Sequence, residues 1–242
     1  MPRQGLRSFL RETSAISERL AQIKKLSNTI IDSDGDYTIE KKMLIERARQ
    51  LVSALTPDIV GAVLPDRLGL EAMTAPMYYA DVYESEHIHV CLFGFKNCNF
   101  VFPLHDHPEM YGFLKVLRGA IALNSYTELS HDEHSKMRST VKLNARSSNR
   151  IVYRFDGVTN CWCSDECVYL GPEFGNIHSL TPLEDGAAFF DLLIPGYGNN
   201  RCTYFKNMTP NPRLKQTCML QKIAEPEDYY CQVLPYNKIK AL

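Results

Sequence analysis

The sequence predicts a mainly β protein, a sandwich or barrel that follows a helical N-terminal segment. Up to about residue 55, apolar residues recur every three or four positions, which is the period of an amphipathic helix. From about Tyr78 the chain changes to short β-rich runs separated by Gly, Pro, Asn and Asp, which is typical of strands and turns. Within this second part, His105 and His107 stand one residue apart, a spacing that sets both side chains on one face of a strand.

Two helices are expected before residue 56. Their apolar positions step by three or four residues, at Ile16, Leu20, Ile23, Leu26 and Ile30 and again at Leu44, Ile45, Ala48, Leu51, Val52 and Leu55. Between them the acidic run Asp32–Asp36 resembles a calcium loop, but its glycine comes before the third acidic residue instead of after it, and Met43 stands where the closing glutamate belongs. We therefore expect a polar turn there. Three prolines within residues 56–76 mark the passage from the helices to the β-rich part.

The expected strands are short, and turn-forming residues separate them. They cover His87–Phe95, Phe113–Leu117, Ala120–Tyr126, Ile151–Phe155, Val168–Leu170 and Ala187–Ile194. Pro103, just before the histidines, and Pro108, just after them, confine that strand to a short segment. Many short strands favour a sandwich or barrel. We therefore expect a helical segment, residues 1–70, packed on a barrel domain, residues 71–242.

Composition narrows the class of protein. The 242 residues suffice to bury a sizeable core, and the net charge of −1 shows none of the excess positive charge typical of nucleic-acid or anionic-membrane binding. No apolar run approaches membrane-spanning length, and the N-terminus has no apolar signal-peptide core. We expect a cytoplasmic protein, with the nucleus as a further location, and a monomer.

The eight cysteines lack the framework spacing of a small disulfide-rich domain, so we expect them to be reduced. Cys161, Cys163 and Cys167 form the one cluster that resembles a zinc site, but paired Cys-x-x-Cys knuckles are missing. We expect them to be structural, with Cys161 and Cys163 on one face of a strand and Trp162 on the other. Of the remaining histidines, His87, His89, His131 and His134 are expected to be solvent or strand residues.

His105, His107 and the distant His178 are the candidate metal ligands. The first two can converge on one ion from one strand, and a later strand can bring His178 to complete a face of three ligands. Imidazole suits iron, zinc, copper and nickel, and three protein ligands leave coordination positions open for water or substrate. The pattern therefore predicts a catalytic rather than a structural metal site.

The flanking residues resemble the two cupin motifs. One surrounds His105 and His107 and ends at Gly119, and the other runs from Gly171 to His178. Gly112 stands where the first motif has its glutamate ligand, and Pro182 stands where the second has asparagine. Such a sequence is similar to cupins with a double-stranded β-helix, or jelly-roll barrel, whose metal is held by three neutral histidines, as in the thiol dioxygenases.

A closer resemblance follows from three segments: Pro103–Gly119, Gly175–Ser179 and Ala187–Tyr197. They are similar to the cysteamine dioxygenase and plant cysteine oxidase family over about residues 75–206. The resemblance implies an enzyme that uses Fe(II) and O2 to oxidise the thiol of cysteamine, or of an N-terminal cysteine on a peptide, to a sulfinate. Both substrates stay candidates.

Four further residues are candidates for the site. The resemblance maps onto Cys202 and Tyr204 a cysteine–tyrosine pair that becomes joined by a thioether in some animal relatives; a core cysteine beside a core tyrosine is the alternative. Asp191 lies in an apolar run where burial would penalise its charge, so it either pairs with a histidine N–H or a substrate ammonium or points outward. Tyr197 is expected to line the mouth of the pocket.

Two other kinds of function remain open at this point. One is a non-redox metal cupin that acts as an isomerase or hydrolase, and the other is a non-catalytic ligand-binding cupin.

If the protein is a thiol dioxygenase, the residues favour an aminothiol substrate without a nearby carboxylate. A carboxylate calls for a cationic clamp, normally arginine, yet the stretch Leu68–Leu117 has no arginine, and its lysines are Lys96 in a turn and Lys115 after the motif. Arg118 lies beside a turn glycine, and Arg150 and Arg201 are the more distant alternatives.

Overall fold

The computed structural model describes residues 2–27, 34–129, 133, 150–198, 200–237 and 239. It confirms a mainly β fold, a double-stranded β-helix with an N-terminal helical extension. The helices are α1 (Pro2–Ser27), α2 (Asp34–Ser53), α3 (Pro57–Val60) and α4 (Arg67–Ala72). The strands are β1 (Met77–Glu84), β2 (His89–Phe95), β3 (Phe102–His105), β4 (Tyr111–Arg118), β5 (Ala120–Glu128), β6 (Arg150–Trp162), β7 (Val168–Leu170), β8 (Ile177–Pro182), β9 (Ala188–Ile194), β10 (Tyr204–Asn207), β11 (Thr217–Ile223) and β12 (Cys231–Val233).

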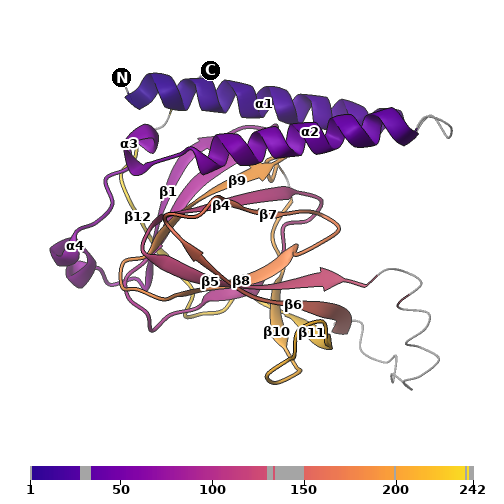
Figure 1. Cartoon of the computed structure of the whole chain (residues 1–242). Coiled ribbons are helices and arrows are strands. Elements are labelled where there is room, and N and C mark those ends of the chain that lie inside the picture. The colour runs from indigo at the N-terminus through magenta and orange to yellow at the C-terminus, as the bar shows by residue number, and fades with distance from the viewer. Residues whose placement is uncertain are drawn as a thin grey trace.

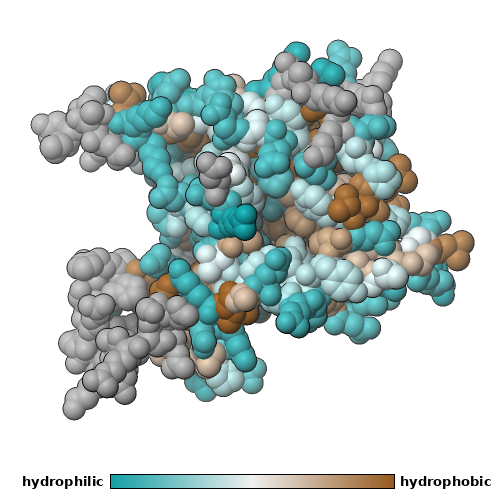
Figure 2. All heavy atoms as spheres, turned by 180° about the vertical axis from the view of Figure 1, so that it is seen from behind, coloured by the Kyte–Doolittle hydropathy of each residue, from teal (hydrophilic) through white to brown (hydrophobic). Residues whose placement is uncertain are grey.

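The strands form two sheets. One has the order β12-β1-β2-β9-β4-β7, and the other runs β10-β11-β6-β5-β8-β3 and closes by pairing β3 with β10. In Figure 1 the helices α1 and α2 lie across the first sheet, and the second sheet lies on its far side. The face in Figure 2 is mostly hydrophilic, with small apolar patches. No helix within the described ranges is long and apolar enough to cross a membrane.

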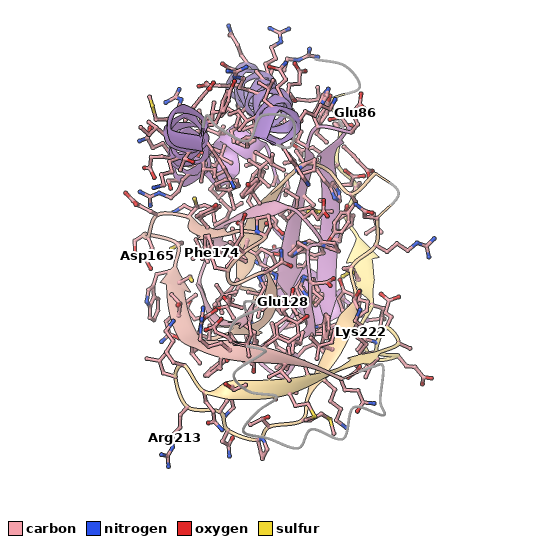
Figure 3. The ribbon with its side chains drawn as sticks, turned by 90° about the vertical axis from the view of Figure 1, so that its right-hand side faces the viewer. Glu86, Glu128, Asp165, Phe174, Arg213 and Lys222 are labelled. Carbon is pink, nitrogen blue, oxygen red and sulfur yellow. The ribbon has the colours of Figure 1, made fainter. Side chains whose placement is uncertain are left out.

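Helix α1 packs on the outer face of the first sheet. Its residues Phe9 and Leu10 belong to a buried cluster that also holds Phe190 and Leu192 of β9. The ring centroids of Phe9 and Phe190 are 5.8 Å apart, in an edge-to-face arrangement. Figure 3 shows the β1–β2 turn, marked by Glu86, reaching up to the helices, where the Ser17 hydroxyl donates a hydrogen bond to the His87 carbonyl at 2.5 Å.

A second cluster fills the space between the sheets. It contains Phe95, Phe102 and Phe189, and the Phe189 ring meets the other two in a tilted arrangement. Strand β9 is therefore covered on both sides, and all seven of its residues are buried. Strands covered on both faces read as continuous apolar runs, which explains the run from Ala188 to Ile194 and leaves Asp191 as its one polar member.

Several expectations about local structure were wrong. Residues 34–36 belong to the first turn of α2 rather than to a polar turn. Pro103 lies inside β3, which ends at His105, so His107 lies in the following turn. Cys161 and Cys163 do not share a face, because Cys161 is buried in β6 and Cys163 is exposed beyond it. The predictions for Ile30, His131 and His134 fall outside the described residues.

Candidate metal centre and substrate pocket

The structure brings His105, His107 and His178 together, although His107 lies beyond the strand that it was expected to share with His105. His105 ends β3 and pairs in register with His178 of β8, so hydrogen bonding between these two strands fixes two ligands side by side. His107 reaches the same point from the turn after β3. The Nε2 atoms of His107 and His178 are 3.1 Å apart, and those of His178 and His105 are 3.2 Å apart. All three side chains are buried.

These distances fit one transition-metal ion. Metal–imidazole bonds of about 2.0–2.1 Å, meeting at about 90–109°, would hold two nitrogens about 2.8–3.4 Å apart. The ligand atoms of all three histidines lie within 4.8 Å of one another, and they are the one such group found among the described residues. The cluster therefore fits a metal site.

The outer nitrogens of two of these rings have partners that orient them. The Nδ1 atom of His105 lies 2.8 Å from the Pro103 carbonyl, and the Nδ1 atom of His107 lies 2.8 Å from the Tyr197 hydroxyl. A proton on Nδ1, donated to these oxygens, leaves the Nε2 lone pair free for a metal. The buried Nδ1 atom of His178 has no hydrogen-bond partner among the described residues.

The electrostatics keep the three imidazoles neutral. Burial lowers the pKa of His105 to about 4, and it lowers the pKa values of His107 and His178 well below their ordinary range, with the neighbouring histidines adding to the effect for these two. A neutral imidazole is the form that binds a metal. The three rings are therefore ready ligands near neutral pH.

Two polar residues that the sequence reasoning missed hold the turn containing His107. Asn176 makes a double contact: its Oδ1 accepts from the His107 N–H at 2.9 Å and its Nδ2 donates to the His107 carbonyl at 2.8 Å. Asp106 accepts from the Thr203 N–H at 2.6 Å, and its own N–H donates to the Thr203 carbonyl at 3.2 Å. The sequence feature that could have pointed to these two residues is that each lies within two positions of a candidate histidine ligand. These bonds fasten the turn both to the loop before β8 and to the segment before β10.

Asp191 lies inside the barrel. Its neighbours in β9, Phe190 and Leu192, face the helices, so the alternation along the strand turns Asp191 to the same side as Phe189, between the sheets. It is 6% exposed, which contradicts the outward-pointing alternative. Burial raises the pKa of Asp191 to about 7.

A row of further polar groups crosses the same inner face, and the sequence reasoning did not assign them to the site. Asp191 pairs in register with Cys91 of β2, which in turn pairs with Asp81 of β1. Nearby, the Tyr79 hydroxyl lies 3.3 Å from the His89 Nε2 atom, and the His89 ring meets the Tyr197 ring edge-on at 5.8 Å. In the sequence, only the alternation of side chains along each strand could have suggested that these residues face the interior.

Tyr197 is close to the metal ligands rather than only at the mouth of the pocket, because its hydroxyl contacts His107. Cys202 is half-buried, and burial raises the pKa of its thiol, with the nearby Tyr204 side chain acting in the opposite sense. The Tyr204 hydroxyl donates a hydrogen bond to Glu225 at 3.0 Å. Tyr204 begins β10 and pairs in register with His105. Cys202 itself precedes the strand, in a segment without regular secondary structure, so the two residues do not share a strand face.

The lysine and arginine side chains closest in sequence to the histidine ligands make hydrogen bonds to other parts of the chain. Lys96 donates to the Met73 carbonyl, and Lys115, although buried, donates to the carbonyls of Cys163 and Asp165. The guanidinium of Arg118 bonds to two backbone carbonyls and to the Tyr78 hydroxyl. Arg201 is exposed, and the side chain of residue 150 lies outside the described part of the chain.

Comparison with known proteins supports the family resemblance. The model of the PCO_ADO family matches residues 46–240. Human 2-aminoethanethiol dioxygenase is 26% identical over 182 residues, which cover 66% of this chain and 67% of that protein. Plant cysteine oxidase 1 of Arabidopsis thaliana is 24% identical over 208 residues, covering 78% of this chain and 64% of that one. A solved structure from Klebsiella pneumoniae with a double-stranded β-helix domain has 14% identity and a TM-score of 0.36, covering 55% of this chain and 86% of its own.

Proposed function

The chain belongs to the PCO_ADO family, and on this basis we propose that it is an Fe(II)-dependent thiol dioxygenase. The observation that carries the proposal is the buried cluster of three neutral imidazoles, whose Nε2 atoms stand 3.1–3.2 Å apart in adjacent pairs. Fe(II), when bound, supplies the redox chemistry that unites a thiol with O2, and both oxygen atoms end on sulfur, so that RSH and O2 give RSO2H without an external reductant.

The residues of the chain have three tasks in this chemistry. Three uncharged ligands leave the charge of a bound cation uncompensated, which favours a thiolate over a thiol. Pro103 and Tyr197 keep two of the imidazoles in the orientation that ligation needs. Phe102 stacks on the His105 ring at 4.7 Å, and its apolar surface helps to exclude water from the centre.

The substrate we propose is an aminothiol, either cysteamine or the N-terminal cysteine of a polypeptide. Asp191 supports this choice because it is a buried carboxylate on the inner face of the barrel, where an ammonium group would offset its cost of burial. Lys96, Lys115 and Arg118 are held by carbonyls away from the ligands and so are poorly placed to clamp a carboxylate. An unpaired substrate carboxylate would cost about 1–3 kcal/mol. Free cysteine should therefore react about tenfold to a hundredfold less efficiently.

We also propose that turnover can join Cys202 to Tyr204. The thiol sulfur would bond to a ring carbon of the tyrosine as the S–H and C–H bonds break. O2 would take up the two hydrogen atoms, as two protons and two electrons, and become H2O2. The effect of the Tyr204 side chain on the pKa of the Cys202 thiol supports their closeness. Protein mass after many turnovers should be lower by two hydrogen atoms in the wild type and unchanged in Cys202→Ala. Peptide mapping that finds only unlinked Cys202 would contradict the proposal.

For the environment of the enzyme, we propose the cytoplasm, with the nucleus as a further location, and a monomeric state. The eight cysteines are all free, which suits a reducing compartment.

The decisive experiment is an anaerobic preparation loaded with Fe(II) and then exposed to O2. Cysteamine, a Cys-initiated peptide and free cysteine are supplied in parallel, and the molecular masses of the products are measured by mass spectrometry. The expected products of the first two are heavier by two oxygen atoms and form only with both iron and O2. Turnover without O2 would instead indicate a non-redox metal enzyme, and binding without turnover would indicate a non-catalytic cupin. Equal efficiency with free cysteine would reject the assignment to aminothiols without a carboxylate.

A further inference from the structure

A groove of about 480 Å³ lies between the helices and the rim of the barrel. We call it the α1–rim groove. Helix α1 contributes Ser17, Leu20, Ala21, Ile23 and Lys24, and α2 contributes Lys41. The rim contributes Pro108, Glu109 and Tyr111 from the segment after His107, and Pro172 and Glu173 from the β7–β8 turn. It also contributes Ile194, the last residue of β9, with Pro195 and Asn200 from the segment that follows.

The rim side of this groove is continuous with the candidate metal centre along the chain. Pro108 follows the ligand His107 directly, and the backbone N–H of Asn200 donates to the carbonyl of Tyr197, whose hydroxyl contacts His107. The loop that contributes Pro172 and Glu173 also contains Asn176, which grips the backbone of His107. All three rim segments of the groove are therefore parts of the frame that holds the ligands.

The walls of the groove are apolar, and their charges are paired. Lys24 of α1 contacts Glu109 at 2.7 Å, and Lys41 of α2 contacts Glu173 at 3.5 Å. The Lys41 ammonium also lies over the Tyr111 ring at 5.5 Å. Each positive charge thus has a negative partner from the opposite wall. An uncharged occupant with apolar side chains matches these walls better than an ionic one.

Glu109 has a backbone φ of 59°, in the left-handed region that favours glycine. The turn in which it lies is closed by the Met110 N–H, which donates to the His107 carbonyl at 3.1 Å. A glutamate in this conformation carries a conformational cost, and its side chain reaches Lys24 on the other wall. The contact between Glu109 and Lys24 therefore links the turn after the ligand His107 to helix α1.

We propose that the α1–rim groove binds the residues that follow the N-terminal cysteine of a polypeptide substrate, with apolar residues preferred at the first few positions. This inference rests on the proposed thiol dioxygenase function, and it extends it by assigning a role to the helices. An extended chain advances about 3.3 Å per residue, so residues two to four of a substrate add about 10 Å of length beyond the cysteine. Cysteamine has no such residues and would leave the groove empty.

The test fills the groove from the helix side. Ala21 is exposed on α1 and lines the groove, so Ala21→Trp can place a large side chain in it without disturbing the core. Ala15 is exposed on the same helix and is not part of the groove, which makes Ala15→Trp the matched control. The substrates are cysteamine and a Cys-initiated decapeptide with leucine or valine at its second to fourth positions. Ala21→Arg provides a second variant with a helix-favouring side chain.

Ala21→Trp is expected to lower kcat/KM for the decapeptide by about tenfold or more, while kcat/KM for cysteamine changes by less than about twofold. Ala15→Trp should change neither. An unchanged value for the decapeptide, or an equal fall for both substrates, would overturn the proposal. A wild-type dimer that Ala21→Trp converts to a monomer would also overturn it, because the occupant of the groove would then be a second copy of the chain. If the wild type oxidises neither thiol, the failure is that of the proposed function itself.

Discussion

At the scale of single residues, burial without a compensating charge decides the properties of the site. The same interior that keeps three imidazoles neutral also raises the pKa of Asp191 to about 7. The two effects act in opposite directions on charge: the bases lose a proton and the acid keeps one. As a result, these four side chains carry little charge by themselves. A bound ammonium would favour the ionised form of Asp191, while a metal ion needs the imidazoles in the neutral form that burial already favours.

The histidine ligands give the most direct prediction. His178→Ala should lower iron content by at least about tenfold and abolish thiol-dependent O2 uptake, because the two remaining ligands hold iron too weakly. His87→Ala is the matched control: it also removes an imidazole, but from the β1–β2 turn, where His87 lies 3.4 Å from Glu18. Metal analysis beside circular dichroism separates ligation from folding. Full iron content in His178→Ala would refute the assignment.

The raised pKa of Asp191 predicts that the stability of the metal-free protein depends on pH. Its pKa rises from 3.8 to about 7 on folding, so the folded state holds the proton more tightly between those values. The free energy of unfolding therefore falls as the pH rises through this window, by up to about 4 kcal/mol. Depressed histidine pKa values act in the opposite sense, so the comparison needed is wild type against Asp191→Asn in urea titrations at several pH values. The variant should gain stability relative to wild type as the pH rises, and parallel curves would contradict this.

At the scale of elements, short connections carry the precision of the site. Strand β3 has only four residues, and His107 lies beyond its end, so hydrogen bonds from other segments have to place this ligand. Asn176 supplies two of them from the loop before β8, and Asp106 adds two more toward the segment before β10. The ligand set is therefore assembled by cross-links between loops as much as by the sheet.

Asn176→Ala tests this role. Losing both hydrogen bonds to the His107 backbone should loosen the turn and weaken iron affinity by about 10–100-fold, the range typical of residues that orient metal ligands. Asn99→Ala, at an exposed position in the β2–β3 turn, is the control. Competition with a chelator of known affinity measures the effect. Equal affinities in the two variants would show that β3 alone positions His107.

At the scale of the whole molecule, the helical extension and the barrel share one hydrophobic layer. The buried cluster under α1 contains residues of both, including Leu10 and Phe190, so neither part buries its apolar face alone. The division at residue 70 stays a prediction about sequence organisation. The packing leads us to expect one cooperative unfolding transition for both parts.

Leu10→Ala should lower the free energy of unfolding by about 2–5 kcal/mol, because Leu10 is completely buried between the helices and the sheet. Leu68→Ala, at a position 73% exposed, should change it by less than about 0.5 kcal/mol. Trp162, the single tryptophan, lies in β6 and reports on the barrel, while far-ultraviolet circular dichroism reports on the helices. Both signals should shift together in Leu10→Ala; separate midpoints would indicate two independent units.

The sequence by itself determined the fold class, the identity of the three clustered histidines and the family. These features depend on local spacing: a period of three to four for helices, a period of two for strands, and fixed motifs around His105 and His178. The predicted ends of the strands were less accurate than the fold class. Pro103, for example, lies within β3, although proline usually marks a strand boundary.

Only the tertiary structure decided which distant side chains face one another. Alternation assigns Cys91 and Asp191 to faces of their strands, but it does not say that β2 and β9 are neighbours in a register that pairs these residues. The same holds for Asn176 beneath His107, and for Lys24 of α1 opposite Glu109. Such contacts depend on how the sheets close and where the helices pack, and those follow from burial summed over the whole chain rather than from any local pattern.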